Sequence, residues 1–224
     1  FDASAETIRR DLAALSRAGR VQKIHGGATL PRVTGEGPFA ERMVLNVEAK
    51  RRIARRAAEL IAPGESLLID TGSTTLVFAE ELAAVDHLTL ITNSAEIARV
   101  AASGNGTASV FLLGGAYRGD NRQTFGSMAI SQLRDYRVDR AVLTVGAVEA
   151  AAGAMDYDPD EAAVAREMMR RAGSVMLLAD ASKFDQTACF TVSSFADIDC
   201  LVCDRAPAGA LGEELRRCDV EVHC

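Results

Sequence analysis

The chain has 224 residues, of which 48% are hydrophobic and 25% are charged, and its mean hydropathy is +0.06. This composition is typical of a folded globular protein and excludes a disordered chain. No apolar run approaches the roughly 20 residues that a membrane-spanning helix needs, and the first residues lack the basic and apolar segments of a signal peptide. We therefore expect a cytoplasmic protein that does not contact a membrane.

The net charge of −6 is unevenly distributed along the chain. Residues 1–56 carry 12 basic and 6 acidic side chains, whereas residues 57–224 carry 13 basic and 25 acidic ones. A basic segment on an acidic body indicates that any contact with a polyanion is made by the N-terminal part. The alternative is that these charges form a solvated helix face.

The first 27 residues are predicted to form a helix, a short strand and a turn. Ile8, Leu12 and Leu15 repeat at helical spacing and are expected to be buried, and Gly19 ends the helix. Residues 20–25 then alternate as a strand before a glycine pair. Residues 28–47 contain two prolines and two further glycines with no sustained period, which predicts a linker.

From residue 48 onward, helical stretches alternate with short apolar runs that are rich in Val, Ile and Leu. Strands buried on both faces have this appearance, and helices between them make right-handed crossovers. The pattern predicts an α/β fold with a doubly wound, mostly parallel sheet. The expected strands are 66–70, 88–92, 109–113, 140–146, 174–179, 200–203 and 219–223, and the expected helices are 48–61, 74–84, 94–102, 126–136, 160–172 and 207–217.

The segment Asp70-Thr71-Gly72-Ser73-Thr74-Thr75 joins the first of these strands to a helix. Ligands of open parallel sheets bind beyond the carboxyl ends of the strands. Gly72 allows the backbone to bend, the hydroxyls can donate, and free N–H groups at a helix start attract anions. The segment is therefore a candidate phosphate-binding loop. An N-cap cluster after a strand explains the same residues.

Other strand ends carry similar residues. Asn93 follows the second strand, Gly114-Gly115 follows the third with Arg118 close behind, and Lys183 follows the fifth. Each alone has an ordinary explanation as a cap, a turn or a surface charge. Because these ends share one rim of the sheet, together they favour a pocket for a small polar anion, in which Arg118 or Lys183 neutralises a phosphate.

Glu161 lies among other acidic residues at the start of a predicted helix. Complementarity with the helix dipole accounts for acidic residues there. A carboxylate that binds sugar hydroxyls, or that acts as a base in an isomerase, accounts for them equally well. Position in the sequence does not decide between the two.

The five cysteines do not indicate a disulfide framework, because their number is odd and the chain is long. Cys200 and Cys203 have zinc-ligand spacing, but they lie in a strand-like run where residues three apart point to opposite faces. We expect core thiols and no metal site. Neither a Walker loop nor a dinucleotide-binding glycine motif is present, so no cofactor is expected.

Two unrelated sets of residues resemble the bacterial transcriptional regulators of the DeoR/GlpR type. Residues 4–12, followed by residues 20–28 ending in His25-Gly26-Gly27-Ala28, resemble the recognition helix and wing. The resemblance continues through Glu41-Arg42, Lys50, residues 70–75, Gly114-Gly115, residues 161–166 and residues 178–184. It covers nearly the whole chain, with both sets in the order of the family.

The resemblance implies a partial winged helix-turn-helix in residues 1–30, a linker in 31–47 and a phosphosugar-binding sensor domain, similar to ribose-5-phosphate isomerase, in 48–224. The printed sequence starts inside the DNA-binding unit, without the helices that precede the recognition helix, so we expect it to bind an operator poorly. The expected DNA contacts are Thr7, Arg9, Arg10, Arg20, Lys23 and His25. The expected effector contacts are Asp70, Gly72, Ser73, Thr74, Thr75, Asn93, Gly114, Gly115, Arg118, Glu161 and Lys183.

The function implied is repression of a carbohydrate utilisation operon under the control of a phosphorylated sugar or polyol, without enzyme activity. Operators with two half-sites predict a homodimer or homotetramer. The alternative function is a phosphosugar isomerase on the same scaffold, with Asp70 or Glu161 as base. An isomerase has no use for a helix that carries Arg9 and Arg10, which favours the regulator.

Overall fold

The computed structural model describes residues 37–224 apart from 105 and 106, and before them residues 7, 8, 12, 22–24, 27–29 and 35. The chain divides into two compact units, Phe1–Thr34 and Gly35–Cys224.

The first unit contains helical residues and a hairpin. Strand β1 (Gln22–Ile24) pairs antiparallel with β2 (Gly27–Thr29), as a wing would. Residues 7, 8 and 12 are helical. The prediction that Ile8 is buried is wrong, because its side chain is 45% exposed. A unit of this size has little apolar surface with which to cover such a residue. Leu15 lies outside the described residues.

The second unit contains a parallel sheet of seven strands in the order β14-β13-β11-β8-β3-β4-β5. The prediction of a parallel α/β sheet is confirmed. The strands are β3 (Ser66–Ile69), β4 (Thr89–Thr92), β5 (Ser109–Leu112), β8 (Val138–Thr144), β11 (Ala172–Leu178), β13 (Cys200–Val202) and β14 (Glu221–His223).

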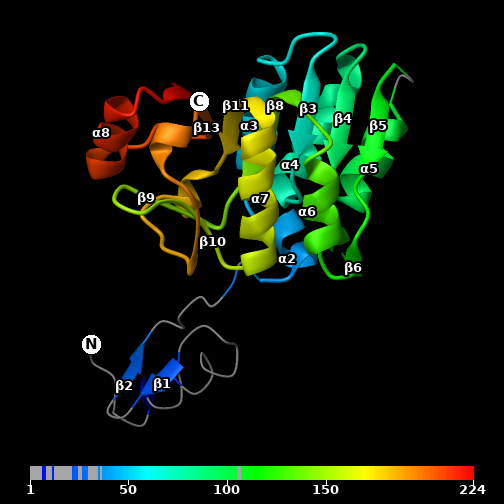
Figure 1. Cartoon of the computed structure of the whole chain (residues 1–224). Helices are drawn as coiled ribbons and strands as arrows, with labels where there is room; N and C mark the ends of the chain where they lie inside the picture. Colours follow the sequence, from blue (N-terminus) through cyan, green and yellow to red (C-terminus); the bar gives the residue numbers. More distant parts are fainter. Residues whose placement is uncertain are drawn as a thin grey trace. The chain divides into compact units, whose positions relative to one another are not determined.

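Helices cover both faces of this sheet (Figure 1). Successive residues of a strand point to opposite faces. Leu68 of β3 therefore packs in one core cluster, while its neighbours Leu67 and Ile69 pack in the other. The first cluster includes α6 (Ser127–Leu133), α7 (Pro159–Arg171) and α8 (Gly209–Arg217), and the second includes α3 (Val47–Ala58), α4 (Ser73–Glu81) and α5 (Ala95–Ala102).

The chain starts the sheet at β3, continues through β4 to the edge at β5, and then returns to β8 on the other side of β3. The direction of winding therefore changes between β3 and β8. The crevice beyond the carboxyl ends of two such strands is the usual ligand site of a doubly wound sheet. The loop after β3 and the residues after β8 meet at this point.

Several short elements were not predicted. Helix α2 (Phe39–Val44) lies within residues 28–47, which lack a helical period, and buries Phe39 in the core. Strands β6 (Ala116–Arg118) and β7 (Gln123–Phe125) form a hairpin. A small antiparallel sheet has the order β12-β10-β9, formed by β9 (Ala147–Glu149), β10 (Gly153–Asp156) and β12 (Phe190–Ser193). The missed strands lack the continuous runs of Val, Ile and Leu that mark the strands of the parallel sheet.

Cys200 and Cys203 are both buried and belong to different core clusters, as residues on opposite faces of β13 and of the segment that follows it should. Burial raises the pKa of the Cys200 thiol to about 11. None of the helices in the described part of the chain is long and apolar enough to span a bilayer.

Gly153→Ala tests how tightly β10 packs against β12. Gly153 has φ +79°, and a Cβ there would lie 2.2 Å from the carbonyl oxygen of Ser193. Gly64 has a similar φ of +83°, but an added methyl there would meet open space, which makes Gly64→Ala the matched control for backbone strain. We expect about 1 kcal/mol of destabilisation for Gly64→Ala and about 2–4 kcal/mol for Gly153→Ala, measured by urea denaturation. Equal costs would contradict the close packing.

Candidate functional site

The loop between β3 and α4 is fixed to the end of β8 by one buried carboxylate. Asp70 Oδ2 accepts a hydrogen bond of 2.8 Å from the amide of Thr144. The Thr75 hydroxyl donates back to the carbonyl oxygens of Asp70 and Gly72, at 3.0 and 3.2 Å. These bonds set the path of residues 70–75 and leave the hydroxyls of Thr71, Ser73 and Thr74 to face other parts of the site.

Gly72 allows the loop to pass close to Thr144 at the end of β8, and it is not needed for a bend in the backbone. Its φ of −167° is extended backbone that any residue adopts. A Cβ at this position would lie 2.2 Å from the Thr144 hydroxyl and 3.0 Å from the Thr75 hydroxyl. Any larger residue would push the loop away from β8.

One side of the loop borders a cleft of about 90 Å³, here named the basic cleft. Ser73 and Thr74 contribute the start of α4, whose first N–H groups have no acceptor within the helix. Three basic residues face them from other elements: Arg42 on α2, Lys50 on α3 and Lys183 beyond β11. The remaining lining residues are Leu45, Asn46, Thr144, Val145, Leu178, Ala179, Asp180 and Ser182. Positive charge and free N–H groups suit an anion.

The basic cleft is built by contacts between α2, α3 and the segment after β11. Lys50 is buried, and its ammonium donates to the carbonyl oxygen of Arg42. Asn46 donates from Nδ2 to Asp180 Oδ1 at 3.1 Å and to the Ser182 hydroxyl at 3.2 Å. Asp180 in turn accepts from the amide of Ser182. The first residues of the second unit are thereby attached to the rim of the sheet.

The preceding residues of the same loop border a much smaller and narrower cleft of about 10 Å³, which suits about one water-sized group and is here named the acidic cleft. Its lining residues are Asp70, Thr71, Asn93, Gln123, Asp156, Glu161, Val164 and Ala165. Three of these carry carboxyl groups, and none is basic. The two clefts thus have opposite charge, and consecutive loop residues separate them.

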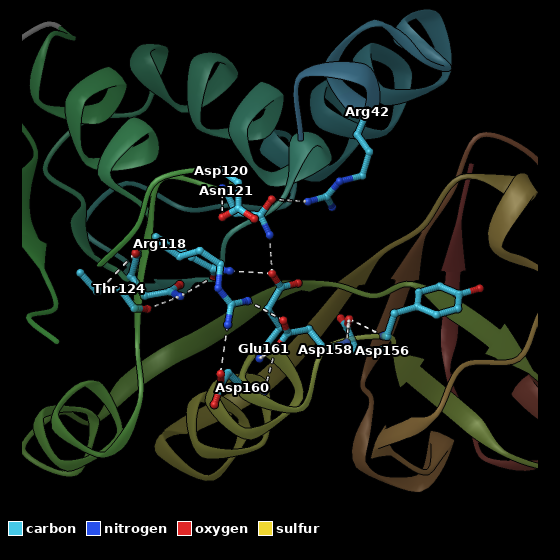
Figure 2. A network of polar contacts seen from close by, with 12 residues as sticks. Arg42, Arg118, Asp120, Asn121, Thr124, Asp156, Asp158, Asp160 and Glu161 are labelled. Carbon is cyan, nitrogen blue, oxygen red and sulfur yellow. Dashed lines mark hydrogen bonds and ion pairs between the residues drawn. The ribbon is translucent and has the colours of Figure 1, made fainter. Parts of the chain in front are cut away.

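A chain of polar contacts joins the acidic cleft to α2 (Figure 2). Glu161 Oε1 accepts from Asn121 Nδ2 at 2.7 Å and from Gln123 Nε2 at 2.6 Å. Asn121 Oδ1 accepts from the guanidinium of Arg42 at 3.3 Å. The conformation of α2 is therefore linked to the position of Glu161 through a single amide side chain.

Burial shifts the titration of the two carboxyl groups at the centre of the site. The pKa of Asp70 is raised well above its ordinary value, mainly by desolvation and further by the charges of Asp156 and Glu161. The pKa of Glu161 is also raised by burial, against the opposing effects of Gln123, Arg42 and Asn121. Perturbed carboxyl groups in a cleft are a common feature of functional sites.

The structure brings together some of the predicted effector residues and separates others. Asp70, Asn93 and Glu161 meet in the acidic cleft, while Ser73, Thr74 and Lys183 meet in the basic cleft. The Thr75 hydroxyl is consumed within the loop. Gly72 supports the loop without lining either cleft.

Three further predicted residues point elsewhere. Arg118 binds Asp158 at 2.5 Å and Asp160 at 3.1 Å and lies over the Phe125 ring, so its guanidinium is engaged away from the loop. Gly114 donates its amide to Gln132, and a Cβ on Gly115 would lie 2.6 Å from the carbonyl oxygen of Phe125. Close packing explains both glycines.

Sequence reasoning did not assign the site residues Arg42, Asn46, Lys50, Gln123 and Asp156. Arg42 and Lys50 are part of the family resemblance, and this was the only sign in the sequence that they belong to a site. Arg42 lies in the predicted linker, and Lys50 lies at the start of a predicted helix. Gln123 lies in the unpredicted hairpin. Of the predicted DNA contacts, Arg9, Arg10, Arg20 and His25 lie outside the described residues, Thr7 is helical, and Lys23 lies in β1.

Comparison with known proteins assigns both parts of the chain. Residues 1–34 match the DeoR-like helix-turn-helix domain, and residues 45–205 match the DeoR C-terminal sensor domain. The chain belongs to the DeoR family. One family relative is the transcriptional repressor CsqR of Escherichia coli K12, 33% identical over 222 residues that cover 99% of this chain and 85% of the relative. Another is the glycerol-3-phosphate regulon repressor of the same strain, 30% identical over 92% of this chain and 82% of the relative.

Two solved structures are similar to this DeoR-family chain at low sequence identity, and the first of them shares its fold. The beta subunit of eIF2B from Chaetomium thermophilum has a TM-score of 0.53 at 16% identity and is covered over 53% of its length by 76% of this chain. Ribose-5-phosphate isomerase A from Methanocaldococcus jannaschii has a TM-score of 0.45 at 20% identity, with 62% of this chain covering 55% of that one. The chain thus spans about half the length of these structures.

Asp70→Asn tests the cost of burying this carboxyl group. Because the pKa of Asp70 is raised in the folded state, the wild type loses stability as pH rises from the ordinary carboxyl pKa near 4 through the folded value. An asparagine oxygen still accepts from Thr144 but does not ionise. We expect the free energy of unfolding of the variant, relative to that of the wild type, to increase with pH over this range. Urea denaturation at several pH values measures it, and a difference that stays constant or falls would contradict the raised pKa.

Proposed function

We propose that the chain is a transcriptional repressor of a carbohydrate utilisation operon whose sensor domain binds a phosphorylated sugar or polyol. The observation that supports the ligand most directly is the pair of oppositely charged clefts on one loop, in a domain that follows a helix-turn-helix domain in the same chain. Relatives named as repressors support a regulator over an enzyme.

In this proposal the phosphate occupies the basic cleft, and a hydroxyl group at the other end of the ligand enters the smaller acidic cleft. The start of α4 with Ser73 and Thr74 supplies N–H and hydroxyl donors, and Lys183 supplies charge. Asp70, Asn93 and Glu161 supply acceptors for hydroxyl groups. A ligand a few carbon atoms long passes over Gly72 and touches both clefts.

The proposed link to DNA binding is α2. This helix comes a few residues after the N-terminal unit ends, and its Arg42 both lines the basic cleft and binds Asn121. A ligand that moves Asn121 or contacts Arg42 in one state of α2 more than in another shifts the equilibrium between those states. On the DNA side, Thr7, Arg9, Arg10, Arg20, Lys23 and His25 remain the proposed operator contacts, and a two-fold operator calls for a homodimer or homotetramer.

Mapping of chromatin occupancy by the native protein in its own cells tests the repressor role. We expect a small number of sites near genes of carbohydrate uptake or metabolism, with occupancy that changes with the carbon source. The matched control is an aldose–ketose isomerase assay with common sugar phosphates, in which we expect no turnover. Turnover by the purified chain, or occupancy spread without preference over the chromosome, would contradict the proposal.

Lys183→Ala tests the position of the phosphate. Loss of one charge-assisted contact should weaken the binding of a phosphorylated ligand about 10- to 100-fold, and the free energy of unfolding should fall by less than about 1 kcal/mol. Calorimetric titration with a panel of sugar and polyol phosphates measures the affinity. Arg217→Ala, at an exposed residue of α8, is the control for loss of a positive charge. Unchanged affinity in Lys183→Ala would remove Lys183 from the site.

A further inference from the structure

The acidic cleft contains buried polar atoms that the folded chain leaves without partners. Asp70 Oδ1, Thr71 Oγ1 and Asn93 Oδ1 make no hydrogen bond with any described residue. Their residues are 7%, 7% and 2% exposed, and all three line the same cleft. Buried polar groups are normally paired, so unpaired ones in a cleft indicate a bound partner.

The groups that remain available there are mainly hydrogen-bond acceptors. Asn93 uses its Nδ2 to donate to Gln123 Oε1 at 3.3 Å and to the carbonyl oxygen of Thr124 at 3.1 Å, which leaves its oxygen for the cleft. The amide groups of Gln123 and Asn121 both donate to Glu161. Asn93 thus uses both N–H groups of its amide within the fold, and two of the three unpaired atoms, Asp70 Oδ1 and Asn93 Oδ1, are acceptors, which favours a ligand that brings donors.

The charge of the cleft opposes a second anion. Asp70, Asp156 and Glu161 line it and no lining residue is basic, while Arg42 and Arg118 act on Glu161 from beyond the lining. Asp156 Oδ1 accepts from the amides of Tyr157 and Asp158, so this carboxyl is held in place by the backbone. The raised pKa values of Asp70 and Glu161 have the same origin, since burial and neighbouring carboxyl groups resist additional negative charge.

A metal ion is a poorer match than a hydroxyl group. The described part of the chain has no group of three or more His, Cys, Asp or Glu side chains spaced to hold one. Alcohol groups supply the missing donors, add no charge, and can also accept from the Thr71 hydroxyl.

We infer that the acidic cleft makes the sensor selective for phosphate esters whose other end carries neutral hydroxyl groups, and that it rejects esters whose other end is a carboxylate. The inference rests on the proposed function, because it takes the phosphate to lie in the basic cleft. Phosphorylated polyols and sugars are then effectors, and phosphorylated sugar acids with the same number of carbon atoms are not.

Calorimetry of the whole chain with matched pairs of ligands tests the selectivity. Sorbitol 6-phosphate and 6-phosphogluconate differ in one terminal group, as do glycerol 3-phosphate and 3-phosphoglycerate. At about pH 8, where the carboxyl groups are most ionised, we expect the alcohol of a pair to bind at least about tenfold more tightly than the acid. An acid that binds as well as its alcohol would overturn the inference and leave the proposed function intact. Failure of every phosphate ester to bind would overturn both.

Glu161→Gln assigns the selectivity to this cleft. The glutamine oxygen can still accept from Asn121 and Gln123, so the fold is preserved while one charge is lost. We expect the ratio of the two affinities to fall at least about threefold, chiefly because the acid binds more tightly. Glu59→Gln removes a charge from an exposed side chain and is expected to leave the ratio unchanged.

Asp70→Asn provides a second variant, which should shift the ratio in the same direction. A ratio unchanged in both cleft variants, or changed equally in Glu59→Gln, would overturn the assignment.

Discussion

The hydrogen bond from the Thr144 amide to Asp70 is the constraint on which the site depends. It joins the ends of β3 and β8, the two strands between which the direction of winding changes. The path of the loop follows from it, since Gly72 can pass against Thr144 only without a side chain. The same loop then faces a basic cleft with Ser73 and Thr74 and an acidic cleft with Asp70 and Thr71.

This arrangement costs the fold some stability. Asp70 uses one carboxylate oxygen for Thr144, while the other is buried without a partner among the described residues. Burial and two nearby carboxyl groups raise its pKa, so the charged form is disfavoured in the folded state. A core optimised for stability would hold an apolar residue here. Residues that break such rules are concentrated at functional sites, which is why this position carries more information than the better satisfied residues around it.

The parts of the structure that can be predicted from the sequence are those with local causes. The runs 66–70, 88–92 and 174–179 are apolar because their strands are covered on both faces, and the predicted bounds agree with β3, β4 and β11 to within about two residues. The candidate loop is recognisable because polar residues directly follow a strand.

The residues that surround that loop come from distant segments, and nothing in their local sequence predicts that they lie beside it. Arg42 lies on a six-residue helix beside a proline, which is too short to show a helical period, and Gln123 lies on a strand, Gln-Thr-Phe, that has no apolar run. Arg118 illustrates the converse situation. Its charge and its place after a strand suggest a ligand contact, but its nearest anions are Asp158 and Asp160, about forty residues further along the chain. Only the tertiary structure shows which acidic group a given arginine meets.

Helix α2 provides the structural link between the two clefts on which the proposed sensor depends. Lys50 donates to the carbonyl oxygen of Arg42, and the Arg42 guanidinium binds Asn121, so the helix is held from the basic side and the acidic side together. Asn121 has one oxygen for Arg42 and one amide group for Glu161. On the proposed function, a ligand hydroxyl that competes for Glu161 would alter the contact that holds α2 without touching the helix itself. Among the contacts described, only the side-chain amide of Asn121 both donates to Glu161 and accepts from Arg42 of α2 (Figure 2). The proposed coupling therefore passes through this one side chain.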